Sequence, residues 1–232
     1  MGFKDLLIPL ILIGIPFVLT AKQPDLGTAL LIVMVSGLML LTMKIRWPVL
    51  VTAVCLTLIA GPVAWKYGLK TYQKNRVLTF LYPNRDPRGA GYNSIQAKIA
   101  VGSGQLFGKG FRKGSQSQLE FLPEKQTDFI FCVLSEEFGF MGCLFTLGIY
   151  AILLLSIIKT AMGSKDMQGA LLCTGVFALI LWHVFINTGM VTGLLPIVGV
   201  PLPLVSYGGT STLTMMIGLG WVSSVHFRKD MF

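Results

Sequence analysis

The fold is decided by residues 119–131, whose sequence is LEFLPEKQTDFIF. Here a polar, basic segment ends and a hydrophobic run begins, and few soluble proteins carry such a run. Asp128 stands at the junction, where a carboxylate can ionise and still lie close to lipid. Thr127 and Asp128 are also good helix-capping residues, since either side chain can accept a hydrogen bond from the free amides of a first turn. Both capping and chemistry are therefore open for Asp128.

The composition is that of a membrane protein. Of the 232 residues, 53% are hydrophobic and 12% are charged, and the mean hydropathy is +0.72. Soluble domains carry about 25% charged residues. We therefore predict an all-α integral membrane protein with one membrane domain over residues 1–232. In a membrane protein, a formal charge of +9 bears first on how the chain is oriented in the bilayer. No nucleic-acid partner is therefore expected from it.

Six segments are apolar enough to be membrane helices, each of which needs about 20 residues. The predicted spans are residues 6–20, 26–43, 47–65, 129–158, 167–192 and 210–225. Asp25 is expected to cap the second span. The region 187–209 is also apolar, but its three prolines and several glycines exclude one continuous helix. We predict a re-entrant loop there, buried in protein rather than in lipid.

Orientation follows from the short loops. If the six spans alternate, one side of the membrane receives Lys4, Lys44, Arg46, Lys159, Lys165, Arg228 and Lys229. That side is predicted to be cytoplasmic and to hold both termini. The long loop 67–127 then faces outward with ten Lys and Arg against three Asp and Glu, which the rule tolerates in long loops. Within it, 71–82 is expected to be an interfacial helix and 92–100 a short helix.

Carboxylates, cations and a glycine- and proline-rich loop converge on the outer face. A carboxylate beside cations suits transfer chemistry on an anionic substrate, because the carboxylate can take a proton from an attacking hydroxyl while cations hold a phosphate leaving group. Attraction to anionic lipid headgroups is the alternative role of the cations. Asp128 is the predicted base, and the substrate-binding candidates are Glu120, Arg76, Lys98, Lys109, Arg112, Lys113 and Ser206.

Other conspicuous residues are predicted to be structural. Glu136 and Glu137 do not share a helical face with Asp128. His183 has no second histidine nearby and is expected to be a hydrogen-bonded core residue. The run GSGQLFGKG at 102–110 is not a nucleotide-binding loop, since glycine follows the lysine where serine or threonine is needed. The cysteines lie in apolar runs without a CxxC pair, so they are expected to be buried hydrophobes and no protein-bound metal centre is predicted; they are Cys55, Cys132, Cys143 and Cys173.

Four stretches resemble the SEDS family of bacterial cell-wall proteins. They are KQPDLGTA at 22–29, YQKNRVLTFL at 72–81, the opening stretch at 119–131, and GLLPIVGVPLPLVSYGG at 193–209. The resemblance covers nearly the whole chain. The loop motifs DPRGAGYNSIQAKIAVGSG at 86–104, GKG at 108–110 and GSQSQ at 114–118 are similar to those of the members that act in cell elongation and rod shape rather than in division.

The resemblance implies a peptidoglycan glycosyltransferase of the bacterial cytoplasmic membrane that polymerises lipid II on the outer face. It implies that Asp128 is the catalytic base, which deprotonates the 4-hydroxyl of the acceptor's N-acetylglucosamine. Cations of the loop, helped by a divalent ion such as Mg²⁺ or Mn²⁺, would hold the lipid-pyrophosphate leaving group, and no organic cofactor is expected. The implied partners are a class B penicillin-binding protein, which is a transpeptidase, and the elongation machinery. A lipid II flippase and a non-catalytic scaffold for cell-wall enzymes are the alternatives.

Members of the family have several further spans ahead of the first one here. Those spans help to wall the substrate cavity. The resemblance therefore predicts either a fragment of a longer protein or a chain that needs a partner to supply them.

Overall fold

The computed structural model describes residues 5–23, 25–43, 47–63, 66, 68, 70–82, 89–115 and 126–231. These ranges are helical and contain no strand, which confirms the all-α prediction. The helices are α1 (Leu7–Lys22), α2 (Leu26–Leu41), α3 (Trp47–Val63), α4 (Thr71–Leu81), α5 (Ala90–Ser103), α7 (Ile130–Met162), α8 (Met167–Thr192) and α9 (Gly209–Met231). All but α4 and α5 coincide with predicted spans, and α4 and α5 are the two helices expected within the long loop.

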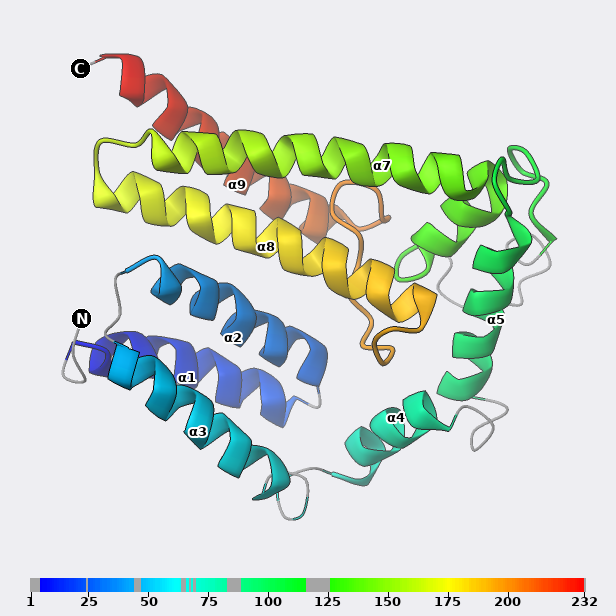
Figure 1. Ribbon diagram of the computed structural model, residues 1–232, viewed down its shortest axis with the longest axis horizontal. Helices are drawn as coiled ribbons and strands as arrows, with labels where there is room; N and C mark the ends of the chain where they lie inside the picture. Colours follow the sequence, from blue (N-terminus) through cyan, green and yellow to red (C-terminus); the bar gives the residue numbers. More distant parts are fainter. Residues whose placement is uncertain are drawn as a thin grey trace.

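The predicted spans alternate in direction along a helical bundle (Figure 1). The start of α1, the turn between α7 and α8 and the last turn of α9 lie at one end, on the left of the view. Helices α4 and α5 and the segment after α8 lie at the other end. Helix α2 packs against α1 and α8, and α8 also packs against α5, α7 and α9.

The outer surface of the bundle is strongly apolar. Helices α7 and α8 are long and apolar enough to cross a membrane, and α1 and α2 are shorter apolar helices. Leu12 on α1 is 66% exposed, and Phe145 and Ile152 on α7 are 72% and 71% exposed. Burying apolar surface is worth about 25 cal/mol per Å², so such a face would be costly in water and suits contact with lipid.

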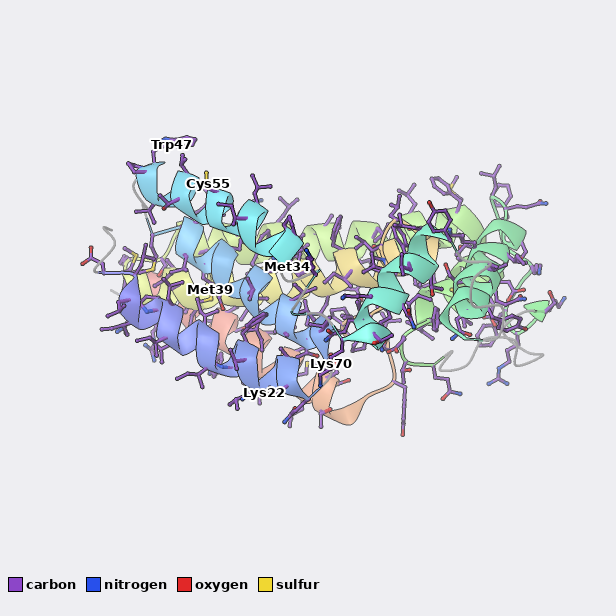
Figure 2. All side chains as sticks on the ribbon, turned by 90° about the horizontal axis from the view of Figure 1, so that it is seen from below. Lys22, Met34, Met39, Trp47, Cys55 and Lys70 are labelled. Atoms are coloured by element: carbon purple, nitrogen blue, oxygen red, sulfur yellow. The ribbon has the colours of Figure 1, made fainter. Side chains whose placement is uncertain are left out.

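Helix α2 approaches α8 closely where α8 has a glycine. A Cβ on Gly175 would lie 3.1 Å from the sulfur of Met39, so the glycine leaves room for the Met39 side chain against α8. Nearby, the Trp182 indole N–H of α8 donates to the Met34 carbonyl at 3.2 Å. Met34 and Met39 are labelled on α2 in Figure 2. These contacts attach the N-terminal helices to the core formed by α5, α7, α8 and α9.

Two smaller predictions have different outcomes. Asp25 caps α2 as expected, since its carboxylate accepts from the backbone N–H of Thr28 at 3.1 Å. Cys132, Cys143 and Cys173 are buried, but Cys55 is exposed, so the prediction of a buried thiol is wrong there. Figure 2 shows Cys55 on α3 pointing away from the other helices. A small apolar side chain has little reason to avoid the lipid-facing side of a membrane helix.

Helix α7 is sharply bent. Gly139 has φ 66° and ψ −162°, which is outside the helical region. The part before Gly139 folds back toward the C-terminal end of α8 (Figure 1). The bend therefore brings the first turn of α7, and Asp128 just ahead of it, to the loop that follows α8.

Candidate active site

A loop replaces the hydrogen bonds that α7 loses at its bend. In an unbroken helix the amides of Phe140 and Met141 would donate to the carbonyls of Glu136 and Glu137. Instead, these carbonyls accept from the amides of Lys109 and Gly110, both at 3.0 Å. The amides of Phe140 and Met141 donate to the carbonyls of Gln105 and Leu106 at 2.8 and 3.1 Å. These four backbone groups of α7 thus have partners in residues 105–110.

Glycines make this insertion possible. A Cβ on Gly104 would lie 1.9 Å from the carbonyl oxygen of Ser135. A Cβ on Gly108, whose φ is +78°, would lie 2.1 Å from the carbonyl oxygen of Glu137. No side chain fits at either distance, so the loop can enter the bend of α7 only with glycine at these positions.

An ion pair joins the same two segments. The ammonium nitrogen of Lys109 lies 2.8 Å from Oε1 of Glu136 and 2.9 Å from the hydroxyl oxygen of Ser115. The Glu136 side chain is 0% exposed and that of Lys109 is 30% exposed. Removing one partner of a buried pair costs about 3–5 kcal/mol, because the other charge stays uncompensated. Glu136 is therefore structural, as predicted, and Lys109 is engaged by it.

The turn that carries Asp128 is held through its backbone. The carbonyls of Gln126, Thr127 and Asp128 accept in succession from Tyr207 N at 2.9 Å, from the Ser206 hydroxyl at 2.6 Å and from Asn187 Nδ2 at 2.9 Å. Helix α7 begins at Ile130 with Phe129 as its N-cap residue. Because Phe129 is the N-cap residue and there is no side-chain cap hydrogen bond, neither Thr127 nor Asp128 occupies the capping position.

Asn187 links α8 to both sides of the site. Its side chain is fully buried, and Nδ2 donates to the carbonyl of Asp128 at 2.9 Å and to that of Val200 at 2.7 Å. Its Oδ1 has no hydrogen-bond partner within the described residues. The sequence analysis did not single out Asn187. An amide near the end of an apolar span was the signal that could have found it.

The Asp128 side chain is partly exposed and faces the backbone of the loop after α8. A Cβ on Gly199 would lie 3.1 Å from Oδ2 of Asp128, and the φ of Gly199 is +73°. The Asp128 carboxylate therefore lies close to the backbone of Gly199. Partial exposure keeps it available to a ligand.

One cavity borders this turn, and a second borders the loop after α8 at Gly199. One of about 780 Å³ is lined by Gln126 and Ile130, which flank Asp128, and by residues 205–209 and the start of α9. The other, of about 310 Å³, lies between α2, α8 and residues 199–201. His183 lines the second cavity, and its Nδ1 lies 2.7 Å from the Leu179 carbonyl oxygen, which confirms the prediction of a hydrogen-bonded histidine.

Two of the predicted cations lie against the loop after α8. The stem of Lys98 packs on Gly193, where an added Cβ would lie 1.9 Å from Cε of the lysine. Arg76 lines a small cavity together with Leu195 and Ile197. Helices α4 and α5 thus bring Arg76 and Lys98 to the segment that also contacts Asp128.

The remaining candidates are placed differently. Arg112 lies 5.4 Å from the centre of the Phe111 ring, and both Arg112 and Lys113 are exposed on the loop beyond the bend of α7. The hydroxyl of Ser206 donates to Thr127 and accepts from Leu202 N, so it holds the backbone of the site. Glu120 lies outside the described residues. The substrate-binding roles of all these residues stay predictions.

The donors around Asp128 limit the kind of metal site that is possible. The described ranges contain no group of three His, Cys, Asp or Glu side chains that could hold an ion. Mg²⁺ in transferases is commonly bound by one or two carboxylates together with substrate phosphates. The residues present therefore fit a cation that arrives with a pyrophosphate better than one held by protein side chains alone.

Known proteins resemble this chain over nearly its full length. The peptidoglycan glycosyltransferase MrdB of Escherichia coli K12 is 46% identical over 231 residues, which are 99% of this chain and 62% of the relative. The peptidoglycan glycosyltransferase RodA of Treponema pallidum is 42% identical over 75% of this chain and 42% of the relative. The chain thus spans less than two thirds of the length of these relatives.

Solved structures share the fold. A chain from a peptidoglycan synthase complex, described as coordinating polymerization and crosslinking, superposes with a TM-score of 0.81 at 30% identity, over 98% of this chain and 63% of that one. The rod shape determining protein RodA of Thermus thermophilus superposes with a TM-score of 0.63 at 26% identity, over 98% of this chain and 58% of that one. The sequence model of the FtsW, RodA and SpoVE proteins, described as cell cycle protein, matches residues 2–230. The chain belongs to this family of cell cycle proteins, which is the SEDS family that its motifs predicted.

Proposed function

We propose that this chain forms the base-bearing part of a peptidoglycan glycosyltransferase that polymerises lipid II during cell elongation. One observation carries the proposal: the turn that carries the partly exposed Asp128 is held by three hydrogen bonds, which its backbone carbonyls accept from α8 and the loop after it. The chain is 46% identical to a protein named peptidoglycan glycosyltransferase, so the same chemistry is the first to test.

Asp128 acts as the general base in the proposed reaction. It takes the proton of the acceptor's 4-hydroxyl, whose oxygen attacks the anomeric carbon of the donor. The new glycosidic C–O bond forms as the bond from that carbon to the lipid pyrophosphate breaks, and the configuration inverts. A positioned base contributes about 10²–10⁴-fold to the rate. The close backbone of Gly199 restricts the positions that the carboxylate can take.

Arg76 and Lys98 are proposed to stabilise the leaving pyrophosphate. Both lie against the loop after α8, where their charges can reach a group bound beside Asp128. Fixed cations that face a developing negative charge are among the largest contributors to catalysis. A divalent cation that arrives with the pyrophosphate would neutralise further charge.

The orientation and the partner belong to the same proposal. The end of the bundle with α4, α5 and the first turn of α7 is proposed to face the cell exterior, and the end with the α7–α8 turn to face the cytoplasm (Figure 1). Lys159 and Lys165 at the cytoplasmic end agree with the positive-inside rule. A class B penicillin-binding protein is the proposed partner, because a structural relative comes from a complex that couples polymerization to crosslinking.

The test uses fluorescent lipid II in proteoliposomes. Glycan strands that lysozyme digests are expected from a polymerase. A flippase moves the lipid between leaflets without making strands, and a scaffold does neither. A second arm adds the spans that precede the matching region of the E. coli relative. Lipid movement without strands in both arms would contradict the proposal.

A further inference from the structure

We propose that Lys109 and Glu136 are positioning residues for Asp128, and that Lys109 does not bind the leaving group. This inference rests on the proposed function of Asp128. The pair joins the loop 105–110 to the part of α7 that follows Asp128, through the 2.8 Å contact between Lys109 Nζ and Glu136 Oε1.

The bend in α7 decides where Asp128 lies. The segment from Ile130 to Gly139 folds back only because residues 105–110 take the place of the helical hydrogen bonds. The Lys109 amide and the Lys109 ammonium group both bind Glu136, at its carbonyl and at its carboxylate. One lysine thus holds the bend through its backbone and its side chain together.

The charge of Glu136 makes the lysine necessary. The Glu136 side chain is 0% exposed, although its carboxylate contacts Lys109 and Ser115. A carboxylate at such depth needs a cation, or it must take up a proton or move toward water. Movement of Glu136 toward water would open the bend.

The short helical segment carries this effect to the active site. Glu136 lies about 9 Å along the helix from Ile130, at about 1.5 Å per residue. Asn187, Ser206 and Tyr207 hold the other end of the segment at residues 126–128. The helix between the bend and residues 126–128 is stiff. A displacement at the bend is therefore transmitted along it and changes the position of Asp128.

Lys109 has little capacity left for a ligand. An ammonium group has three donors. Two of them are directed at Glu136 Oε1 and at the Ser115 hydroxyl, at 2.8 and 2.9 Å. Binding a pyrophosphate would leave the buried Glu136 carboxylate without its cation. Lys98 packs on Gly193 beside the loop after α8 and forms no ion pair with a carboxylate within the described residues.

The decisive experiment compares Lys109→Met, Glu136→Gln and the double variant. Each single variant is expected to lower kcat for lipid II polymerisation by about 10²-fold with little change in KM, since a misplacement of about 1 Å can cost that much. The double variant is expected to recover most of the rate, because no uncompensated charge remains. Lys159→Met makes the same lysine-to-methionine change at an exposed position of α7. This variant is expected to behave as the wild type.

Two results would overturn the inference. If Lys109 binds the leaving group, the double variant will stay as slow as Lys109→Met. If the pair has no effect on Asp128, both single variants will keep the wild-type kcat.

Hydrogen exchange tests the pair independently of catalysis. Deuterium uptake at residues 126–138 is expected to rise in Lys109→Met and to return toward the wild-type level in the double variant. Unchanged uptake in Lys109→Met would contradict the inference even if the wild-type chain makes no glycan. If the wild type makes no glycan but the exchange pattern is as expected, the proposed function is contradicted. The structural role of the Lys109–Glu136 pair at the bend is then still supported.

Discussion

Asn187 Nδ2 lies 2.9 Å from the carbonyl oxygen of Asp128 and 2.7 Å from that of Val200. A single buried amide on α8 thus joins the turn ahead of α7 to the loop that follows α8. These segments are far apart in the sequence, and their meeting creates the surroundings of Asp128. The geometry of the candidate site therefore depends on α8 as much as on α7.

Asn187→Leu is expected to reduce both stability and activity. The substitution leaves the buried carbonyls of Asp128 and Val200 without their donor, at about 1–3 kcal/mol for each unsatisfied group. Thermal unfolding in detergent and the rate of strand formation measure the two effects. Thr188→Val is the control, since the Thr188 hydroxyl bonds only within its own helix. Wild-type activity in Asn187→Leu would show that the turn is held by other contacts.

Gly199→Ala is expected to impair catalysis more than stability. The φ of +73° disfavours any side chain by about 1–2 kcal/mol. The new methyl group would also lie 3.1 Å from Oδ2 of Asp128 and displace the carboxylate. Gly37→Ala on α2 is a matched control, because nothing lies within 4 Å of its added Cβ. Equal strand formation by both variants would mean that the close approach of Gly199 to the Asp128 carboxylate is not needed for catalysis.

Tyr150→Phe is expected to loosen the loop after α8. The buried Tyr150 hydroxyl of α7 donates to the Pro203 carbonyl, and its loss leaves a buried acceptor at a cost of about 1–3 kcal/mol. Thr146→Val on the same helix should have a smaller effect, since the Thr146 hydroxyl bonds to the Gly142 carbonyl one turn away. Limited proteolysis within residues 193–208 reports the change. Identical cleavage in Tyr150→Phe and the wild type would rule out this role.

Gly104→Ala is expected to prevent correct folding of the bend. The added Cβ would lie 1.9 Å from the Ser135 carbonyl oxygen, so the loop could no longer enter α7. Gly102→Ala, two positions earlier, meets nothing within 4 Å and should be tolerated. The yield of monodisperse protein after size-exclusion chromatography separates the two variants. Normal yield of Gly104→Ala would show that the loop has room to shift.

The helices were largely predictable from the sequence, because membrane spans are long and apolar. The predicted span 167–192 coincides with α8, and the first five spans begin within one residue of their helices. The prolines of residues 193–208 also predicted correctly that α8 does not continue into α9. These features depend on local composition, which a sequence shows directly.

The bend of α7 could not be predicted in the same way. Gly139 is one of several glycines within apolar spans, and nothing local distinguishes it from Gly148, around which an added Cβ would meet nothing within 4 Å. What distinguishes Gly139 is the loop 105–110, which arrives from a distant part of the sequence. The ion pair of Lys109 with Glu136 depends on the same distant contact, so the sequence could not show it, and Lys109 was placed only among the substrate-binding candidates.

The most direct test of the central claim compares Asp128→Asn with Asp166→Asn in a lipid II polymerisation assay. Asp166 is the N-cap of α8, and asparagine caps helices about as well as aspartate, so this variant controls for the loss of a carboxylate elsewhere. We expect Asp166→Asn to form glycan strands at the wild-type rate, and Asp128→Asn to be slower by about 10²–10⁴-fold. Strand formation by Asp128→Asn at the wild-type rate would contradict the assignment of Asp128 as the base.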